Sequence, residues 1–187
     1  QQFPPFLTLI YRTIVMCIVG HIWQGGEDMK CDEEMFAKLY ESVFPDLYRY
    51  ALCILGHPQD AEDAVSEAVT AAYGNIRKLR KREAFKSWIF TILANVCRKR
   101  MRTEARERKK AEGSERECIP FEEMDHAVAL DVRRAFAVLT DEEQEIIGLS
   151  VFGGYSSREI GRMLDQSDNT IRSRRSRALK KMEVMLR

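Results

Sequence analysis

The stretch from Ser156 to Lys181 constrains the fold of this 187-residue chain more than any other. It opens with Ser156, whose hydroxyl is suited to capping a helix, and Glu159 follows at the spacing of a capping box. One apolar face comes next at helical spacing, formed by Ile160, Met163 and Leu164. Residues 165–167 indicate a tight break, after which a second helix is expected to start near Asp168. This order of elements predicts a helix-turn-helix.

The second of these two helices combines an apolar stripe with a strongly basic surface. Its candidates for burial are Ile171, Ala178, Leu179 and Met182. Its other faces carry Arg172, Arg174, Arg175, Arg177, Lys180 and Lys181. Such a helix is typical of a recognition helix that enters the major groove of DNA. The alternative is a solvated basic helix on an ordinary bundle, but the cap, the break and the paired apolar faces favour DNA binding.

The rest of the chain is expected to be helical too, which makes the fold class all-α. Only ten glycines and five prolines interrupt the sequence, and long stretches contain neither. The net charge of +1 would not by itself suggest a nucleic-acid partner. The charges are segregated, however, because residues 31–67 are predominantly acidic whereas three other segments are strongly basic: 77–86, 98–110 and 172–181.

Three helices are predicted before residue 104. The first follows an apolar stripe from Phe36, restarts at Pro45 and ends at Gly56. The second has polar positions at Asp60, Glu62, Asp63, Ser66, Glu67 and Thr70. Such an acidic face is either simply solvated or docks on a basic protein partner. A basic connector at 74–83 leads to the third helix, in which Phe85 and Trp88 are interpreted as core residues rather than as platforms for unpaired bases.

Two small helical domains and a linker follow from this pattern. Residues 29–103 form the first domain, and the densely charged stretch 104–121 indicates a flexible, partly disordered linker. Residues 122–187 form the second domain, in which Thr140 and Glu143 make another capping-box pair before a helix that ends at two glycines.

The beginning of the chain lies outside the helical pattern described so far. The sequence starts with Gln1, and codons for residues 25–29 could include a ribosome-binding site and a start codon. Our hypothesis is therefore that residues 1–28 are a translated leader.

The five cysteines form no disulfide framework, which indicates reduced thiols in a cytoplasmic protein. The hypothesis that one of them is a redox-sensing thiol stays open. No pattern predicts a catalytic residue, a metal site or a cofactor.

In their order and spacing, these elements resemble the sigma-70 family of bacterial RNA polymerase sigma factors, in its compact extracytoplasmic-function (ECF) group. The resemblance covers residues 34–185. In the first domain it rests on Asp60-Ala61-Glu62-Asp63 and on Phe85-Lys86-Ser87-Trp88-Ile89. In the second domain it rests on Leu139-Thr140, on Tyr155-Ser156 and on Asn169-Thr170-Ile171-Arg172-Ser173-Arg174.

The resemblance implies a sigma factor that binds core RNA polymerase and directs promoter-specific initiation. Clamp helices of the largest polymerase subunit would be bound by Asp60, Glu62, Asp63, Ser66 and Glu67. The melted downstream (−10) strand would be held by Lys78, Arg80, Lys81, Arg82, Lys86, Asn95, Arg98 and Lys99. The upstream (−35) element would be bound by Thr170, Arg172, Ser173, Arg174 and Arg177, with Ser156 and Ser157 also contacting DNA.

The resemblance also implies partners and a location. The flap of the second-largest polymerase subunit, promoter DNA and an anti-sigma factor, often membrane-bound, are expected partners of a cytoplasmic protein without catalytic activity or small-molecule substrate. Two alternative functions fit parts of the sequence. One is a helix-turn-helix regulator that binds duplex DNA without polymerase, against which the acidic first domain argues. The other is a membrane-anchored sensor that uses the apolar residues 3–19.

Overall fold

The structure is a computed structural model that describes residues 28–79, 81–110 and 126–186, and every regular element in these ranges is a helix. The first group comprises α2 (Asp28–Leu55), α3 (Pro58–Gly74), the short 3-10 helices η1 (Ile76–Lys78) and η2 (Arg82–Ala84), and α4 (Phe85–Lys110). The second group comprises α5 (His126–Ala137), α6 (Asp141–Val151), α7 (Ser157–Leu164) and α8 (Asp168–Met185). The predicted all-α fold is confirmed.

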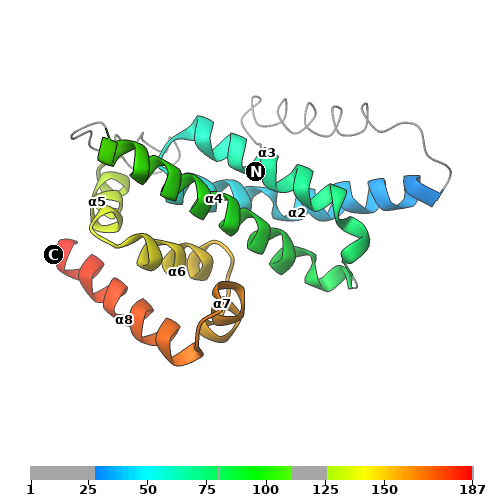
Figure 1. The fold of residues 1–187 in the computed structure, drawn as a ribbon. Helices are drawn as coiled ribbons and strands as arrows, with labels where there is room; N and C mark the ends of the chain where they lie inside the picture. The colour runs from blue at the N-terminus through cyan, green and yellow to red at the C-terminus, as the bar shows by residue number, and fades with distance from the viewer. Residues whose placement is uncertain (1–27, 80, 111–125, 187) are drawn as a thin grey trace.

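Helices α2, α3 and α4 pack side by side into a bundle (Figure 1). Aromatic rings fill much of its interior, since Phe36 lies edge-on to both Tyr73 and Phe85 with ring centroids 5.3 and 5.4 Å apart. Phe85 is 1% exposed, as the sequence predicted, and Trp88 is partly buried against the same core. Small residues of α3, such as Ala64 and Ala68, let this helix approach its neighbours closely.

Pro45 lies inside α2, which runs through it without interruption. The prediction that the helix restarts at this proline is therefore wrong. Proline removes one backbone hydrogen bond and crowds the carbonyl of the preceding turn. Core residues before and after the proline, Phe44 and Leu47, are nevertheless buried, with exposed fractions of 7% and 1%. Packing on both sides of the proline thus offsets the local cost and keeps one helix.

Helix α4 continues to Lys110, seven residues beyond the expected end of the first domain. Residues 104–110 are rich in Arg, Lys and Glu, whose unbranched side chains favour the extension of an existing helix. The remainder of the expected linker, residues 111–121, lies outside the described residues. So do residues 1–27 of the leader hypothesis. Within the described ranges, no helix is both long and apolar enough to cross a membrane.

Helices α5 to α8 form the second helical unit, in which α8 packs against α5, α6 and α7. Two of its four predicted core positions, Ile171 and Ala178, have no exposed surface, and Met182 is partly buried. Leu179 is 47% exposed, so the prediction of its burial is wrong. It is the immediate neighbour of buried Ala178, and the 100° between successive helical residues turns it away from the core.

The two helical units share one large hydrophobic core, beside which the second unit has a small cluster of its own formed by Leu139, Ile147 and Ala178. Leu149 and Tyr155, together with Ile146, Ile160 and Ile171, belong to the same buried cluster as the residues of α2, α3 and α4. Helix α6 lies directly against α2, and α6, α7 and α8 lie to one side of the α2–α4 bundle (Figure 1). This closed arrangement was not anticipated from the sequence.

Candidate nucleic-acid interface

The turn between α7 and α8 is fixed by a close backbone approach. Asp165 adopts a left-handed conformation with φ of 53°, and the N–H of Gln166 donates to the carbonyl of Gly161 over 2.8 Å. A Cβ on Gly161 would lie only 2.6 Å from the carbonyl oxygen of Gln166. Ser167 then caps α8 by accepting a hydrogen bond from the Thr170 N–H at 3.1 Å. The predicted helix-turn-helix is confirmed, with its break at residues 165–167.

The outer face of α8 carries the residues that the sequence assigned to the −35 element. Arg172, Ser173 and Arg177 are exposed, whereas Thr170 and Arg174 are half-buried. Arg172 pairs with Asp168 at 2.7 Å, and Nη2 of Arg177 donates to the Ser173 hydroxyl at 3.1 Å. Arg172 and Arg177 therefore hydrogen-bond within α8 itself, on an outer surface that is mainly basic.

Arg174 is held more firmly than the other arginines of α8. Its Nη1 atom donates to Oε1 of Gln166 at 2.9 Å and also pairs with Oε2 of Glu142 at 2.6 Å. Glu142 stands in the acidic first turn of α6, within the same helical unit. Arg174 must leave this carboxylate to contact a base.

Ser156 closes a complete capping box at the start of α7. Its hydroxyl donates to Oε2 of Glu159 at 2.6 Å and accepts from the Glu159 N–H at 3.4 Å, while its own N–H donates to the same carboxylate at 2.8 Å. These hydrogen bonds lower the pKa of Glu159, with the Ser156 hydroxyl as the largest cause. The cap therefore contributes at neutral pH and weakens as the pH falls toward that pKa.

Replacing Ser156 with alanine is expected to reduce the free energy of unfolding by about 1 kcal/mol, because the N–H of Glu159 loses the hydroxyl that caps it. The pKa of Glu159 should rise toward its ordinary value in the same variant. Urea unfolding and NMR titration of the carboxyl carbon measure the two effects. Ser176→Ala, at an exposed position in the middle of α8, is the matched control and should leave stability and pKa unchanged; equal behaviour of the two variants would contradict the capping role.

The acidic face of α3 lies on the opposite side of that helix from its buried alanines. Asp60, Asp63 and Glu67 are exposed, and Glu62 and Ser66 are half-buried. Glu67 pairs with Arg100 of α4 at 3.1 Å. Partial burial, followed by the negative charge of Asp63, raises the pKa of Glu62. This face concentrates negative charge where a basic partner surface can reach it.

The connector and α4 carry the residues assigned to the melted −10 strand. Lys81, Arg82, Asn95 and Lys99 are exposed. Lys86 is half-buried, pairs with Asp46 at 2.9 Å and lies 5.8 Å from the centre of the Phe90 ring. The side chain of Lys78 and the whole of Arg80 lie outside the described residues.

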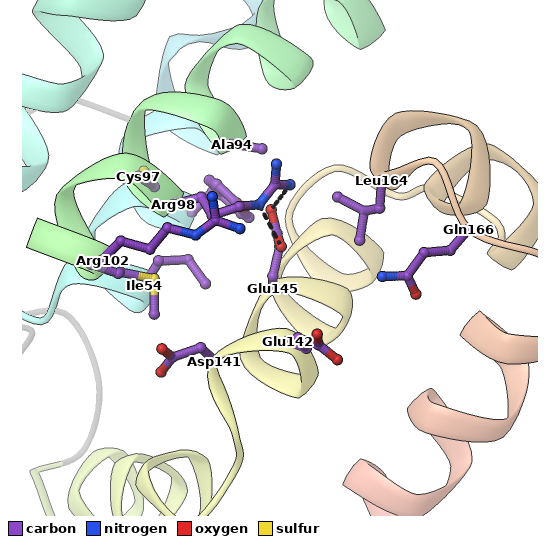
Figure 2. A pocket seen from close by; sticks show the side chains of 12 residues that line it. Ile54, Ala94, Cys97, Arg98, Arg102, Asp141, Glu142, Glu145, Leu164 and Gln166 are labelled. Carbon is purple, nitrogen blue, oxygen red and sulfur yellow. Dashed lines mark hydrogen bonds and ion pairs between the residues drawn. The ribbon is translucent and has the colours of Figure 1, made fainter. Parts of the chain in front are cut away.

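Arg98 departs from this exposed set because it faces the second helical unit. Its Nη2 and Nε donate to the two carboxylate oxygens of Glu145 at 2.6 and 3.3 Å (Figure 2). Its Nη1 donates to Oδ1 of Asn95 at 3.0 Å. Glu145 belongs to α6 and is 9% exposed. Its burial raises its pKa and outweighs the opposing effect of Arg98. An arginine predicted to hold DNA is thus engaged by a buried carboxylate.

A cleft of about 310 Å³ opens beside this ion pair, between α4 and the acidic first turn of α6 (Figure 2). Close to it, the Tyr50 ring packs against the backbone of α6 at Gly148, where an added Cβ would lie 3.0 Å from the ring. The Tyr50 hydroxyl is buried and has no hydrogen-bond partner among the described residues. Tyr155 completes the contact, edge-on to Phe90 with centroids 5.5 Å apart.

The thiol of Cys97 also lines this cleft. Its side chain is 1% exposed, and burial raises its pKa to about 12. Redox chemistry starts from the thiolate, which this environment disfavours. Cys97 is therefore a small core residue in the closed arrangement.

Sequence reasoning missed the contact between the two helical units. The one local signal was Gly148, a glycine in the interior of a helix where no turn is needed. Such a glycine often marks a close approach by another element. The partner of that approach, Tyr50, lies 98 residues earlier, at a distance that no local pattern reveals.

Comparison with known proteins places both helical units in one family. Residues 39–107 match the model for sigma-70 region 2, and residues 129–182 match that for sigma-70 region 4. The chain belongs to the sigma-70 family. Together with its relatives, these regions define an ECF sigma factor, the subunit that binds RNA polymerase and directs it to promoters.

Two relatives illustrate the similarity. The chain is 30% identical over 144 residues to the RNA polymerase sigma factor SigV of Bacillus subtilis, covering 75% of this chain and 84% of SigV. It is 28% identical over 147 residues to the ECF sigma factor EcfG of Rhodopseudomonas palustris, covering 78% and 81%. The regulator without polymerase docking is not favoured, since both sigma regions match.

Solved structures share the fold. The sigma factor RpoE of Bartonella quintana, in complex with the anti-sigma factor NepR, aligns with a TM-score of 0.70 and 26% identity over 81% of this chain and 96% of that one. CnrH in complex with the cytosolic domain of CnrY aligns with a TM-score of 0.61 at 19% identity. Sigma factors are generally non-enzymatic regulators, and no group of His, Cys, Asp or Glu in the described ranges is placed to hold a metal.

Proposed function

We propose that three surfaces divide the work of promoter recognition in this sigma factor. The acidic face of α3 docks on the polymerase clamp helices, with Asp63 at its centre. The connector and α4 hold the melted −10 strand. The basic face of α8 enters the major groove of the −35 element, where Arg172, Arg174 and Arg177 are the candidates for base contacts, and Ser156, Ser157, Thr170 and Ser173 those for DNA backbone contacts.

The observation that carries this proposal is the two-faced construction of α8. Ile171 and Ala178 have no exposed surface, while Arg172, Ser173 and Arg177 on the other side are exposed. A capped turn sets this helix at a fixed angle to α7. A rigid helix with an open basic face is what the major groove accommodates.

We further propose that the chain divides into a polymerase-docking and −10 domain at 29–103, a linker at 104–121, and a −35 domain at 122–187. The matched regions, 39–107 and 129–182, support this division. The linker would thread toward the polymerase active centre, and the second domain would contact the flap of the second-largest subunit.

An anti-sigma factor is a further proposed partner. Support comes from RpoE, whose solved structure contains the anti-sigma factor NepR. This chain would act in the cytoplasm, without catalytic activity of its own, and its anti-sigma factor would be bound to the membrane or free.

Run-off transcription with core RNA polymerase on genomic fragments tests the proposed function. Specific initiation that depends on the added chain is the expected result. Duplex DNA binding without initiation would contradict it and would favour the regulator instead.

Replacing Arg174 with alanine is expected to weaken use of the −35 element roughly 5- to 150-fold, the loss of one bidentate arginine–guanine contact. Core affinity should not change, because Arg174 is not among the residues proposed to contact polymerase. Arg134→Ala, an exposed arginine of α5, is the matched control. Run-off transcription on promoters with intact and scrambled −35 elements measures the effect. If the variant preferred the intact promoter as strongly as the parent does, Arg174 would not contact a base.

A further inference from the structure

Two consecutive glutamates in the first turn of α6 contact one side of α8. Glu142 pairs with Arg174 at 2.6 Å, and both carboxylate oxygens of Glu143 accept hydrogen bonds from Nζ of Lys181 at 2.8 Å. Arg174 and Lys181 lie almost two helical turns apart along the chain, so they share one side of α8. Exposed Arg172 lies on nearly the opposite side.

The carboxylate of Glu143 is held in place by its own helix as well as by Lys181. Its Oε2 accepts the Thr140 N–H at 3.0 Å, and the Glu143 N–H donates to the Thr140 hydroxyl at 3.3 Å. Burial by itself would raise the pKa of Glu143, but the hydrogen bonds from Lys181 and Thr140 outweigh it and lower that pKa. An ion pair between two mobile side chains contributes little, because both must be ordered. Here only Lys181 has to be ordered, since the capping box already fixes its partner.

This pair lies beside the small apolar cluster that joins α6 to α8. Ile147, one turn after Glu143, packs in that cluster with Ala178, which precedes Lys181 by three residues. The apolar contact keeps the two helices close together. The short side chain of Ala178 interlocks little with its neighbours, however, so it offers little resistance to rotation of α8 about its own axis. A directed hydrogen bond from Lys181 to a fixed carboxylate opposes that rotation.

The rotation of α8 about its axis decides which of its side chains meet base edges. A helix with its side chains is about 10–12 Å across, so a rotation of ~20° moves its outer surface by about 2 Å. A shift of about 2 Å is enough to break a hydrogen bond to a base edge. Arg174 cannot hold α8 while it contacts a base, because it must first leave Glu142. Lys181 can stay with Glu143 throughout.

We propose that Lys181 and Glu143 are positioning residues for −35 recognition, whose contact holds α8 at the rotation that presents its other basic side chains to the major groove. Lys181 itself does not contact DNA. This inference rests on the proposed assignment of α8 to the −35 element. Loss of the pair therefore lowers the preference for the correct −35 sequence more than it lowers binding to DNA in general.

Lys181→Met and Glu143→Gln test the proposal in the full-length chain bound to core RNA polymerase. Methionine removes the charge but keeps an unbranched side chain. Glutamine keeps the capping box, while its amide nitrogen turns a donor toward Lys181.

The quantity to measure is the ratio of affinities for two fluorescent duplexes of a promoter found by run-off transcription, one with an intact and one with a scrambled −35 element. We expect each variant to lower this ratio about ten-fold, within the factor of roughly 5 to 150 that one base contact contributes. The double variant should lower it no further, because both substitutions remove the same contact.

The affinity ratio separates positioning from other roles of the pair. Partial unfolding, or loss of a phosphate contact, would weaken binding to both duplexes by the same factor and leave the ratio unchanged. If Lys181 contacted a base itself, Glu143→Gln would free it, and the ratio would stay the same or rise. The proposal is overturned if either Lys181→Met or Glu143→Gln keeps the ratio of the parent chain.

Lys180→Met and Asp141→Asn are the matched controls. They make the same changes of charge at exposed positions, next to Lys181 on α8 and in the first turn of α6. Both should keep the ratio of the parent chain, and an equal fall in the controls would show a general effect of charge and overturn the proposal. Failure of the proposed function is seen separately, in a parent chain that does not distinguish the two duplexes before any substitution.

Discussion

Replacing Gly161 with alanine is expected to destabilise the second helical unit by about 1–3 kcal/mol and to abolish recognition of the −35 element. The added methyl carbon would lie 2.6 Å from the Gln166 carbonyl oxygen and 3.5 Å from the Asp168 nitrogen. Both are backbone atoms, so the turn itself must move, and α8 would change its angle to α7. Thermal unfolding and run-off transcription on a −35-dependent promoter measure the two effects.

The matched control is Gly74→Ala at the end of α3. A Cβ there meets nothing within 4 Å, so this substitution should be neutral or slightly stabilising, because alanine favours helix. If the two variants unfolded at the same temperature and initiated equally well, Gly161 would not be needed for the geometry of the turn.

Replacing Asp63 with lysine is expected to weaken binding to core RNA polymerase by roughly ten- to a hundred-fold, which corresponds to about 1.4–2.8 kcal/mol. Asp63 is exposed on the face of α3 proposed to dock on a basic polymerase surface. The substitution removes one attraction and introduces one repulsion there. Fluorescence titration with core enzyme measures the affinity, and the melting temperature should stay close to that of the parent.

Asp131→Lys provides the same charge change at an exposed position of α5. It should leave core affinity close to that of the parent chain. If Asp63→Lys retained full affinity, the assignment of α3 to the polymerase interface would be wrong. An equal loss of affinity in both variants would indicate a general effect of charge rather than a docking site.

The helical elements could be predicted from sequence because their signals are local. Both capping boxes, Ser156 with Glu159 and Thr140 with Glu143, appear in the structure with both of their reciprocal hydrogen bonds. The helix-turn-helix followed from the same rules. Local rules failed at Pro45, where aromatic and aliphatic packing on both sides of the proline outweighs its intrinsic preference to end a helix.

The arrangement of the two helical units could not be predicted in the same way. Arg98 and Glu145 are 47 residues apart, and each alone is an ordinary charged residue on a helix. Sequence could assign Arg98 to a basic surface but could not show that an acidic helix covers it. The assignment of single residues to polymerase or DNA stays a prediction, because such contacts are formed with molecules outside the chain.

The buried hydroxyl of Tyr50 destabilises the contact between the two helical units. It has no hydrogen-bond partner among the described residues, and a buried polar group in that condition costs about 1–3 kcal/mol relative to one that is hydrated. Separation of α6 from α2 would return this hydroxyl to water. Rehydration of this one hydroxyl would therefore offset part of the stabilisation that the apolar packing around it provides.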